Sequence, residues 1–318
     1  MKSLVIFACA LFAAGHGAGA AAQASPPWSG QANNPARDRG YVFPVPGVDN
    51  VPDLHGNPSG AKLVLFIGGN QFFVLPQLIA AFEAHHPELA GHIFYETLPP
   101  GILRRQMAAA NTLTLGNLTL TVQPDVYEAG VRVLHQMQQT GQVKNVVPYA
   151  TNTLEIMIKA GNPHQIHSLN DLARPELRLS MPNPEWEGVA NQIADSLRKA
   201  GGEELYKAVY KTKAQTGKTM LTEIHHRQTP MRILQNQADA GVTWASEVRF
   251  QESIHNPIAG VAIPHDQNTT AVYAGGVVTG APHPQAAAQW LEFLKTPEAQ
   301  AIYRRYGFQS IAASPHQE

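Results

Sequence analysis

The chain has 318 residues, of which 44% are hydrophobic and 15% are charged, and its formal net charge is −1 at pH 7. This is the composition of an ordinary soluble globular protein of one or two lobes. Because there is no basic surplus, a nucleic acid or an acidic membrane surface is not expected as a partner.

The first 24 residues have the pattern of a secretory signal peptide. Lys2 precedes the apolar run LVIFACALFAA, and small residues follow as far as Ala24. We therefore expect cleavage near Ala24 and a periplasmic protein with no direct membrane insertion, since no later segment reaches about 18 uninterrupted apolar residues. The single cysteine, Cys9, lies inside this segment, so the mature protein is expected to have no disulfide and no thiol chemistry.

The next region, residues 25–60, is crowded with Pro, Gly, Asn and Asp and shows no sustained period. This composition predicts an extended leader that lies on the fold without being part of its core, or a partly disordered segment. Removal of residues 25–55 is therefore expected to leave folding and ligand affinity largely intact.

Regular elements begin at Lys62. Residues 62–67 are an apolar run that predicts a buried strand, and Leu75, Leu78 and Phe82 then recur at helical spacing. Further strands are expected at residues 92–98, 125–129, 154–161, 177–181, 240–247 and 271–278, and further helices at residues 102–110, 131–139, 188–200, 286–295 and 297–308. This alternation predicts an α/β fold with mainly parallel sheets covered by helices on both faces.

Polar residues gather where the expected strands pass into helices. These places are residues 68–71, 97–101 and 183–188, together with the HHR stretch at residues 225–227 before the helix that Thr229 and Pro230 open. In open α/β sheets, ligands bind outside the carboxyl ends of the strands. Helix N-termini at that edge present unpaired N–H groups, which favour anions.

Over residues 62–308 the chain resembles the type II periplasmic solute-binding proteins of ABC importers, nearest the molybdate/tungstate-binding family. Six segments carry the resemblance in order: KLVLFIGGN, LPPGILRRQM, QPDVYEAG, SLNDLARPELRLSMPNPEWEGVANQI, ADAGVTWASEV and WLEFLKTPEAQAIYRRYGF. The resemblance implies two α/β lobes, joined by crossover strands, that close on a solute at their interface.

The resemblance also implies a set of ligand contacts. Carried over along the matching segments, these fall on Asn70, on Pro100 or Gly101, on Glu187 and Gly188, on His226 and on Trp244. The neighbours Gln71, His225 and Arg227 are added to the expected ligand-binding set because they stand beside these positions.

The hydroxyl side chains with which the family holds a bare oxyanion are missing from these positions, and basic residues stand there instead. The resemblance and these substitutions together predict an anion pocket with His225, His226 and Arg227 as one wall. Such a wall suits a carboxylate or a phosphorylated small molecule as well as an oxyanion. If the histidines touch the ligand, affinity is expected to weaken between pH 5.5 and 8.

Other interpretations of the same residues stay open. Asn70 fits a helix cap, Glu187 fits the first turn of a helix, Trp244 fits core packing, and residues 225–227 fit a solvated loop. Adjacent histidines bind one metal ion only across a sharp bend, and the sequence has no HExxH motif. It also has no GxSxG, Walker A or GxGxxG motif, so we assign no metal ligand, cofactor or catalytic residue.

The sequence therefore predicts a non-enzymatic, monomeric receptor that captures a small anionic solute and delivers it to a membrane ABC permease. The alternatives are a secreted hydrolase or lyase on a similar scaffold, and a receptor for a metal or a metal chelate. The expected division is a signal peptide at residues 1–24, a leader at 25–60, lobe one at 61–149 plus 246–318, and lobe two at 150–245.

Overall fold

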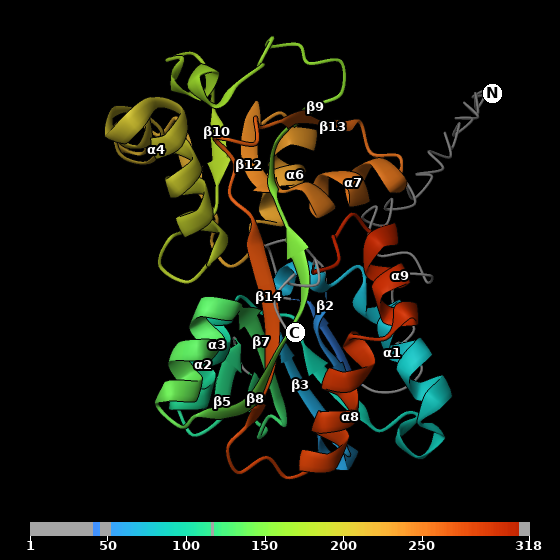
Figure 1. The fold of residues 1–318 in the computed structure, drawn as a ribbon. Helices are drawn as coiled ribbons and strands as arrows, with labels where there is room; N and C mark the ends of the chain where they lie inside the picture. The colour runs from blue at the N-terminus through green and yellow to red at the C-terminus, as the bar shows by residue number, and fades with distance from the viewer. Residues whose placement is uncertain (1–40, 45–51, 116–117, 312–318) are drawn as a thin grey trace, which may run out of the picture.

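The computed structural model describes residues 41–44, 52–115 and 118–311 (Figure 1). The predicted signal peptide and most of the predicted leader lie outside these ranges. The described chain forms two lobes, each built around its own β-sheet. Between the lobes, the strand β14 lies beside the segment that leads from β8 to β9. The two-lobed α/β fold is therefore confirmed.

The first lobe is built on a seven-stranded sheet. In sheet order its strands are β1 (Tyr41–Pro44), β2 (Pro52–Gly56), β4 (Ile93–Glu96), β3 (Leu63–Ile67), β7 (Val126–Gly130), β14 (Ala271–Val278) and β8 (Val143–Asn152). Only β4, β3 and β7 are parallel to one another, and the other neighbours pair antiparallel.

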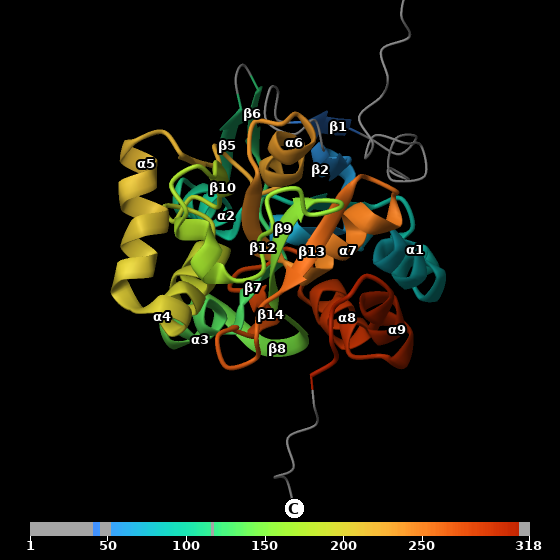
Figure 2. The same ribbon diagram turned by 90° about the horizontal axis from the view of Figure 1, so that it is seen from above.

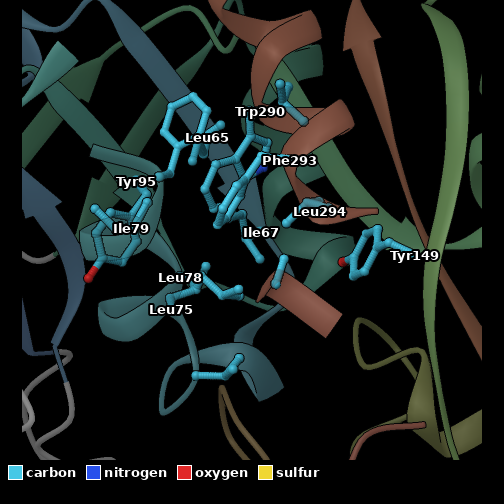
Figure 3. Close-up of a cluster of buried hydrophobic side chains, with 14 of the residues drawn as sticks. Leu65, Ile67, Leu75, Leu78, Ile79, Tyr95, Tyr149, Trp290, Phe293 and Leu294 are labelled. Carbon is cyan, nitrogen blue, oxygen red and sulfur yellow. The ribbon is translucent and has the colours of Figure 1, made fainter. Parts of the chain in front are cut away.

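Strand β3 is apolar throughout because helices cover both faces of this sheet. On one face Leu65 and Ile67 pack against α1 (Leu75–His85), α8 (Pro284–Leu294) and α9 (Pro297–Arg305), as Figure 3 shows for α1 and α8. On the other face Val64 and Phe66 pack against α2 (Pro100–Ala108) and α3 (Val131–Gln139). Alternate side chains of one strand thus enter two separate cores.

The second lobe is built on a five-stranded sheet. Its strands, in order, are β11 (Thr219–Leu221), β10 (Leu179–Met181), β12 (Ala240–Trp244), β9 (Leu154–Lys159) and β13 (Ile258–Ala262). The helix α4 (Val189–Lys207) covers one face, while α6 (Gln228–Leu234) and α7 (Ala245–Ser253) cover the other. Seen from above, α4 lies on the side of the molecule opposite α1 and α9 (Figure 2).

Short elements complete the described chain. They are the 3-10 turns η3 (Pro58–Gly60), η4 (Gly69–Gln71), η5 (Pro87–Leu89) and η6 (Leu169–Ala173), the hairpin of β5 (Thr112–Leu115) with β6 (Leu118–Thr121), the π-helical turn η7 (Ala208–Thr212) and the short helix α5 (Lys213–Gln215). The helix expected to end at residue 200 is broken there by Gly201 and Gly202, and φ of Gly202 is +69°, a conformation that glycine adopts without penalty.

The prediction of mainly parallel sheets is wrong, because both sheets are mixed. The reason is the two crossovers between the lobes: β8 leads into β9, and β13 leads into β14. Within their sheets, β14 pairs antiparallel with β7 and β8, and β9 pairs antiparallel with β12 and β13. The sequence analysis did not predict β8, β11, β13 or the β5–β6 hairpin as strands.

The second crossover also lies later in the chain than expected. The sequence prediction returned the chain to lobe one at residue 246, but β13 pairs with β9 in the five-stranded sheet, and α7 packs against β9, β12 and β13. Division by sheets therefore gives residues 153–262 to the second lobe. As a proposal for the domain boundaries, we place the return crossover between Ala262 and Ala271.

The predicted leader needs a correction where the structure describes it. Strand β2 pairs antiparallel with β4, with Leu54 opposite Glu96. Leu54 is 2% exposed and belongs to the core cluster beneath α2 and α3, and Asp53 is fully buried. Its backbone pairing and apolar contacts make residues 52–56 part of the first lobe, so the expectation that residues 25–55 can be removed does not hold for this strand.

We predict that Leu54→Ala lowers the free energy of unfolding by about 2–5 kcal/mol, because it leaves a cavity in a closed core. Urea unfolding followed by circular dichroism measures this value. Leu120→Ala, on the partly exposed β5–β6 hairpin, serves as the control and should cost less. If Leu54→Ala lowers the free energy of unfolding by less than about 1 kcal/mol, β2 is a peripheral part of the leader and not part of the core.

Candidate ligand-binding site

A cavity of about 410 Å³ lies between the two sheets. From the first lobe it is lined by Gly68, Gly69, Asn70, Pro99, Pro100, residues 129–133 and Tyr273, and from the second by Glu187, Gly188, Val189, Asn191, Gln192, Asp195, His225, His226 and Trp244. Apart from Tyr273, which lies within β14, most of these residues stand where strands pass into helices, which is where the sequence analysis expected a ligand.

Four helical elements begin at the cavity wall. They are η4 at Gly69, α2 at Pro100, α3 at Val131 and α4 at Val189. The N-terminus of α2 offers little to a ligand, because Pro100 has no N–H group and Gly101 donates its own to the carbonyl oxygen of Trp186 at 3.1 Å. The first N–H groups of α3 have no acceptor within their helix, so this end supplies donors and a positive dipole end to the cavity. In α4, Ala190 and Asn191 already donate to the carbonyl oxygens of Glu187 and Gly188, so this end contributes its positive dipole end and the N–H group of Val189.

Tyr273 is a hydroxyl donor at the cavity wall that the sequence analysis missed. The side-chain amide nitrogen of Asn70 donates to its hydroxyl oxygen at 2.6 Å, and that of Asn152 does so at 3.5 Å. The orientation of Asn152 is fixed because its amide oxygen accepts from the backbone N–H of Thr153. With amide donors on both sides, the Tyr273 hydroxyl keeps its proton available for an acceptor in the cavity. Burial raises the pKa of Tyr273 above its ordinary value, which keeps that proton in place.

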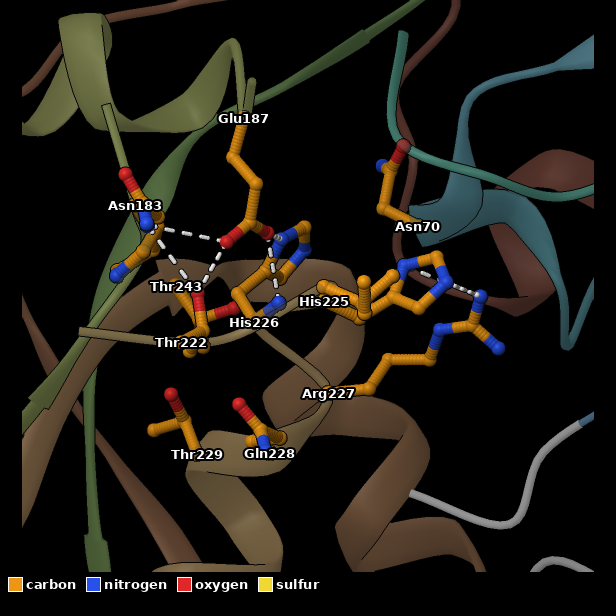
Figure 4. Close-up of polar contacts among 12 residues, drawn as sticks. Asn70, Asn183, Glu187, Thr222, His225, His226, Arg227, Gln228, Thr229 and Thr243 are labelled. Atoms are coloured by element: carbon orange, nitrogen blue, oxygen red, sulfur yellow. Dashed lines mark hydrogen bonds and ion pairs between the residues drawn. The ribbon is translucent and has the colours of Figure 1, made fainter. Parts of the chain in front are cut away.

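The predicted cationic wall divides in the structure, and Arg227 does not reach the cavity. Its guanidinium donates to Asp53 at 2.6 Å and to the carbonyl oxygen of Thr97 at 2.8 Å, and it lies over the ring of Phe72. His225 shares the same carboxylate, with 2.9 Å between its Nε2 and Oδ1 of Asp53. Figure 4 shows the Arg227 guanidinium beside the His225 ring and apart from Glu187.

The acidic partner of this cluster comes from β2. Burial raises the pKa of Asp53, but His225 and Arg227 outweigh this effect and hold the pKa below its ordinary value. Asp53 is therefore ionised, and its charge is opposed by the buried guanidinium. Arg227, which the sequence analysis expected in the wall of the anion pocket, thus binds a carboxylate of the protein itself.

His226 lines the cavity, but both of its ring nitrogens face carboxylates. Nδ1 bonds to Glu187, and Nε2 lies 2.9 Å from Oε1 of Glu247. Glu187 also accepts the backbone N–H of His226 at 2.6 Å and the hydroxyl of Thr222. Burial lowers the pKa of His226, but Glu247 and Glu187 outweigh it and raise the pKa to about 10.

Six of the nine predicted ligand-binding residues line the cavity: Asn70, Glu187, Gly188, His225, His226 and Trp244. Gln71, Gly101 and Arg227 do not line it. Gln71 is fully buried, donating to the Tyr149 hydroxyl and accepting from that of Tyr303. Gly101 lies against the backbone of Trp186. For Glu187 the wall position does not make the carboxylate available, since His226 and Thr222 already occupy it.

Besides Tyr273, the sequence analysis missed Arg132 and Asp53. A signal existed for Arg132, because residues 131–139 were expected to form a helix directly after a strand, as at the other cavity positions. No such signal existed for Tyr273, which stands in the middle of a strand, or for Asp53, which is 174 residues from Arg227.

In the part of the chain that the structure describes, no group of three or more His, Cys, Asp or Glu side chains is arranged to hold a metal ion. None of the described helices has both the length and the apolar character needed to cross a bilayer.

Two lobes on separate sheets, with a cavity between them at the strand ends, are the architecture of a two-lobed solute-binding protein. The chain belongs to the bacterial extracellular solute-binding proteins, whose family model matches residues 63–309. The molybdate-binding protein ModA of Mycobacterium tuberculosis is 25% identical over 257 residues, which are 80% of this chain and 87% of ModA. The resemblance seen in the sequence is therefore confirmed.

Two solved structures share the fold. The sulfate-binding protein SubI of Mycobacterium tuberculosis H37Rv superimposes with a TM-score of 0.61 at 20% identity, covering 78% of this chain and 86% of SubI. The periplasmic molybdate-binding protein of Azotobacter vinelandii superimposes with a TM-score of 0.61 at 15% identity, covering 79% of this chain and all of that protein.

We predict that Arg227→Met lowers the free energy of unfolding by about 3–5 kcal/mol, because it leaves the Asp53 carboxylate buried without its guanidinium. Adding Asp53→Asn should recover part of the loss, and a double-mutant cycle measured by urea unfolding gives the coupling. Arg249→Met, at an exposed position of α7, is the control. A loss confined to ligand affinity, with unfolding unchanged, would support the original assignment of Arg227 to the ligand.

A second prediction concerns pH. The pKa of His226 is raised from its ordinary value near 6.5 to about 10, so its pairing stabilises the fold fully below pH ~6.5. That contribution is lost as the pH rises toward 10. The free energy of unfolding, measured at steps from pH 6.5 to 10, should fall in the wild type and should fall less steeply in His226→Gln. Equal slopes in both proteins would show that His226 does not carry the effect.

Proposed function

We propose that this protein captures a small anionic solute in the periplasm and delivers it to a membrane ABC permease. Membership in the solute-binding family supports capture of a solute, and the relatives named for molybdate and sulfate support an anion. In the proposed division of labour, the receptor holds the solute between its lobes and the permease supplies transport.

The observation that carries the anionic assignment is the hydroxyl of Tyr273 between two amide donors. A group placed against this hydroxyl meets an O–H donor, and the N-termini of α3 and α4 add backbone N–H donors to the same cavity. An anion supplies only acceptors and fits such a donor set. Ligand recognition by neutral donors differs from the cationic wall expected from the sequence.

Ligand binding in this cavity would favour the closed arrangement of the lobes, because both lobes contribute wall residues. Two glycines support a close approach of the lobes. A Cβ atom on Gly69 would come within 2.8 Å of the His225 ring, and one on Gly101 would come within 2.7 Å of the Trp186 carbonyl oxygen. Both glycines belong to the first lobe and both contacts to the second.

We predict that Tyr273→Phe weakens anion binding about 10- to 100-fold, the usual effect of one hydrogen bond to a charged group. Calorimetry with molybdate, sulfate and inorganic phosphate identifies the best-bound of the three and measures its dissociation constant in both proteins. Bound ligand should also raise the melting temperature of the wild type without being consumed.

The control is Tyr206→Phe, which removes a hydroxyl from α4 at a position outside the cavity wall, and it should bind as the wild type does. Unchanged affinity in Tyr273→Phe would remove the proposed hydroxyl contact. If none of the three anions binds the wild type, and no organic acid does either, the anionic assignment itself fails.

A further inference from the structure

We propose that Arg132 and the groove between α3 and α4 form a second subsite, and that the solute is an organic anion with two acidic groups. This inference rests on the proposed function, since the first acidic group would lie near Tyr273 in the cavity. It goes further by naming the class of solute and the residue that selects it.

The size of the cavity is the first observation. Its volume is about 410 Å³, whereas a bare oxyanion is a single central atom with its oxygens. The volume lies in the range of about 300–1,000 Å³ that is typical of pockets for organic ligands. A bare oxyanion would leave most of this space to solvent.

The cavity also continues beyond its own walls. A second cavity of about 430 Å³ lies between α3 and α4, and the two share four lining residues: Arg132, Val133, Asn191 and Asp195. A solute held near Tyr273 can therefore extend past these shared residues into the groove. The wall of the first cavity also includes Val131, Val133 and Val189, which suit a carbon spacer.

The distribution of charge is the second observation. Among the described residues that line the first cavity, the basic side chains are Arg132, His225 and His226. Both histidines are bound to carboxylates of the protein. No carboxylate of the described chain pairs with Arg132, which is exposed in the first turn of α3. It is therefore the lining cation that is left for a ligand.

The remaining charges of the groove are already matched. Nε of Arg198 lies 2.7 Å from Oε2 of Glu203, and its Nη1 lies 3.7 Å from Oδ1 of Asp195. Because Asp195 has this cation beside it, its charge repels a second acidic group of the solute less strongly. A guanidinium binds a carboxylate or a phosphate through two parallel N–H bonds. Arg132 thus fits the second acidic group of a dicarboxylate or of a phosphorylated carboxylic acid.

The test is calorimetry on the full mature chain with two sets of probes. One set holds the bare oxyanions sulfate, molybdate and inorganic phosphate, and the other holds the two-acid compounds succinate, glutarate and 2-phosphoglycerate. We expect at least one two-acid compound to bind more tightly than every bare oxyanion. Arg132→Gln should weaken that compound about 10- to 100-fold and should change the affinity for bare oxyanions less than about twofold.

Two further variants make the result specific. Asn191→Phe fills the shared part of the groove without removing a charge and should weaken the same two-acid compound while sparing the bare oxyanions. Arg305→Gln, which removes an exposed arginine of α9 outside both cavities, should bind every probe as the wild type does.

The outcomes separate the inference from the proposed function. If a bare oxyanion binds at least as tightly as every two-acid compound, or if Arg132→Gln has no effect on the two-acid compound, the second subsite is overturned and anion binding stands. An equal loss for both sets of probes also overturns it, because Arg132 would then act on a single common site. If neither set binds, both proposals fail together.

Discussion

The buried ion pair between Arg227 and Asp53 joins the two lobes beside the cavity. A charge that is 4% exposed is costly unless a carboxylate opposes it, since removal from water costs several kcal/mol per ion. Asp53 opposes it from β2, a strand of the other lobe, and the carbonyl oxygen of Thr97 accepts a second bond. One interaction therefore ties β2 into the fold and joins the two lobes beside the cavity.

Because the carboxylates of the protein take up Arg227, His225 and His226, recognition of a solute falls to other groups. The cavity keeps the neutral donors of Tyr273 and of the helix N-termini, and Arg132 lies at the boundary with the α3–α4 groove. Neutral donors bind an anion without placing an unpaired buried charge beside Tyr273. In the proposed arrangement, Arg132 at the boundary distinguishes solutes by their second acidic group, whereas the neutral donors bind the first.

Local patterns in the sequence were enough to predict the main helices, the buried parallel strands and the edge of the sheets that carries the cavity. Apolar runs and helical spacing located β3, α1 and α4, the turns after the strands located Asn70 and Gly188, and the family resemblance located Trp244. Side-chain partners could not be predicted, because they join distant segments: Asp53 meets Arg227, and His226 meets both Glu187 and Glu247. A basic HHR stretch looks the same in sequence whether its charges are opposed or free. The same limit hid β2, whose Pro- and Gly-rich surroundings gave no sign of its pairing with β4.

The most direct test of this account is a crystal structure of the protein with selenate, a bare oxyanion whose selenium can be located by anomalous scattering. The account predicts a peak inside the cavity, with a selenate oxygen at hydrogen-bonding distance from the Tyr273 hydroxyl and with Arg227 still bound to Asp53. A selenate bound to the Arg227 guanidinium, with Asp53 displaced, would contradict it.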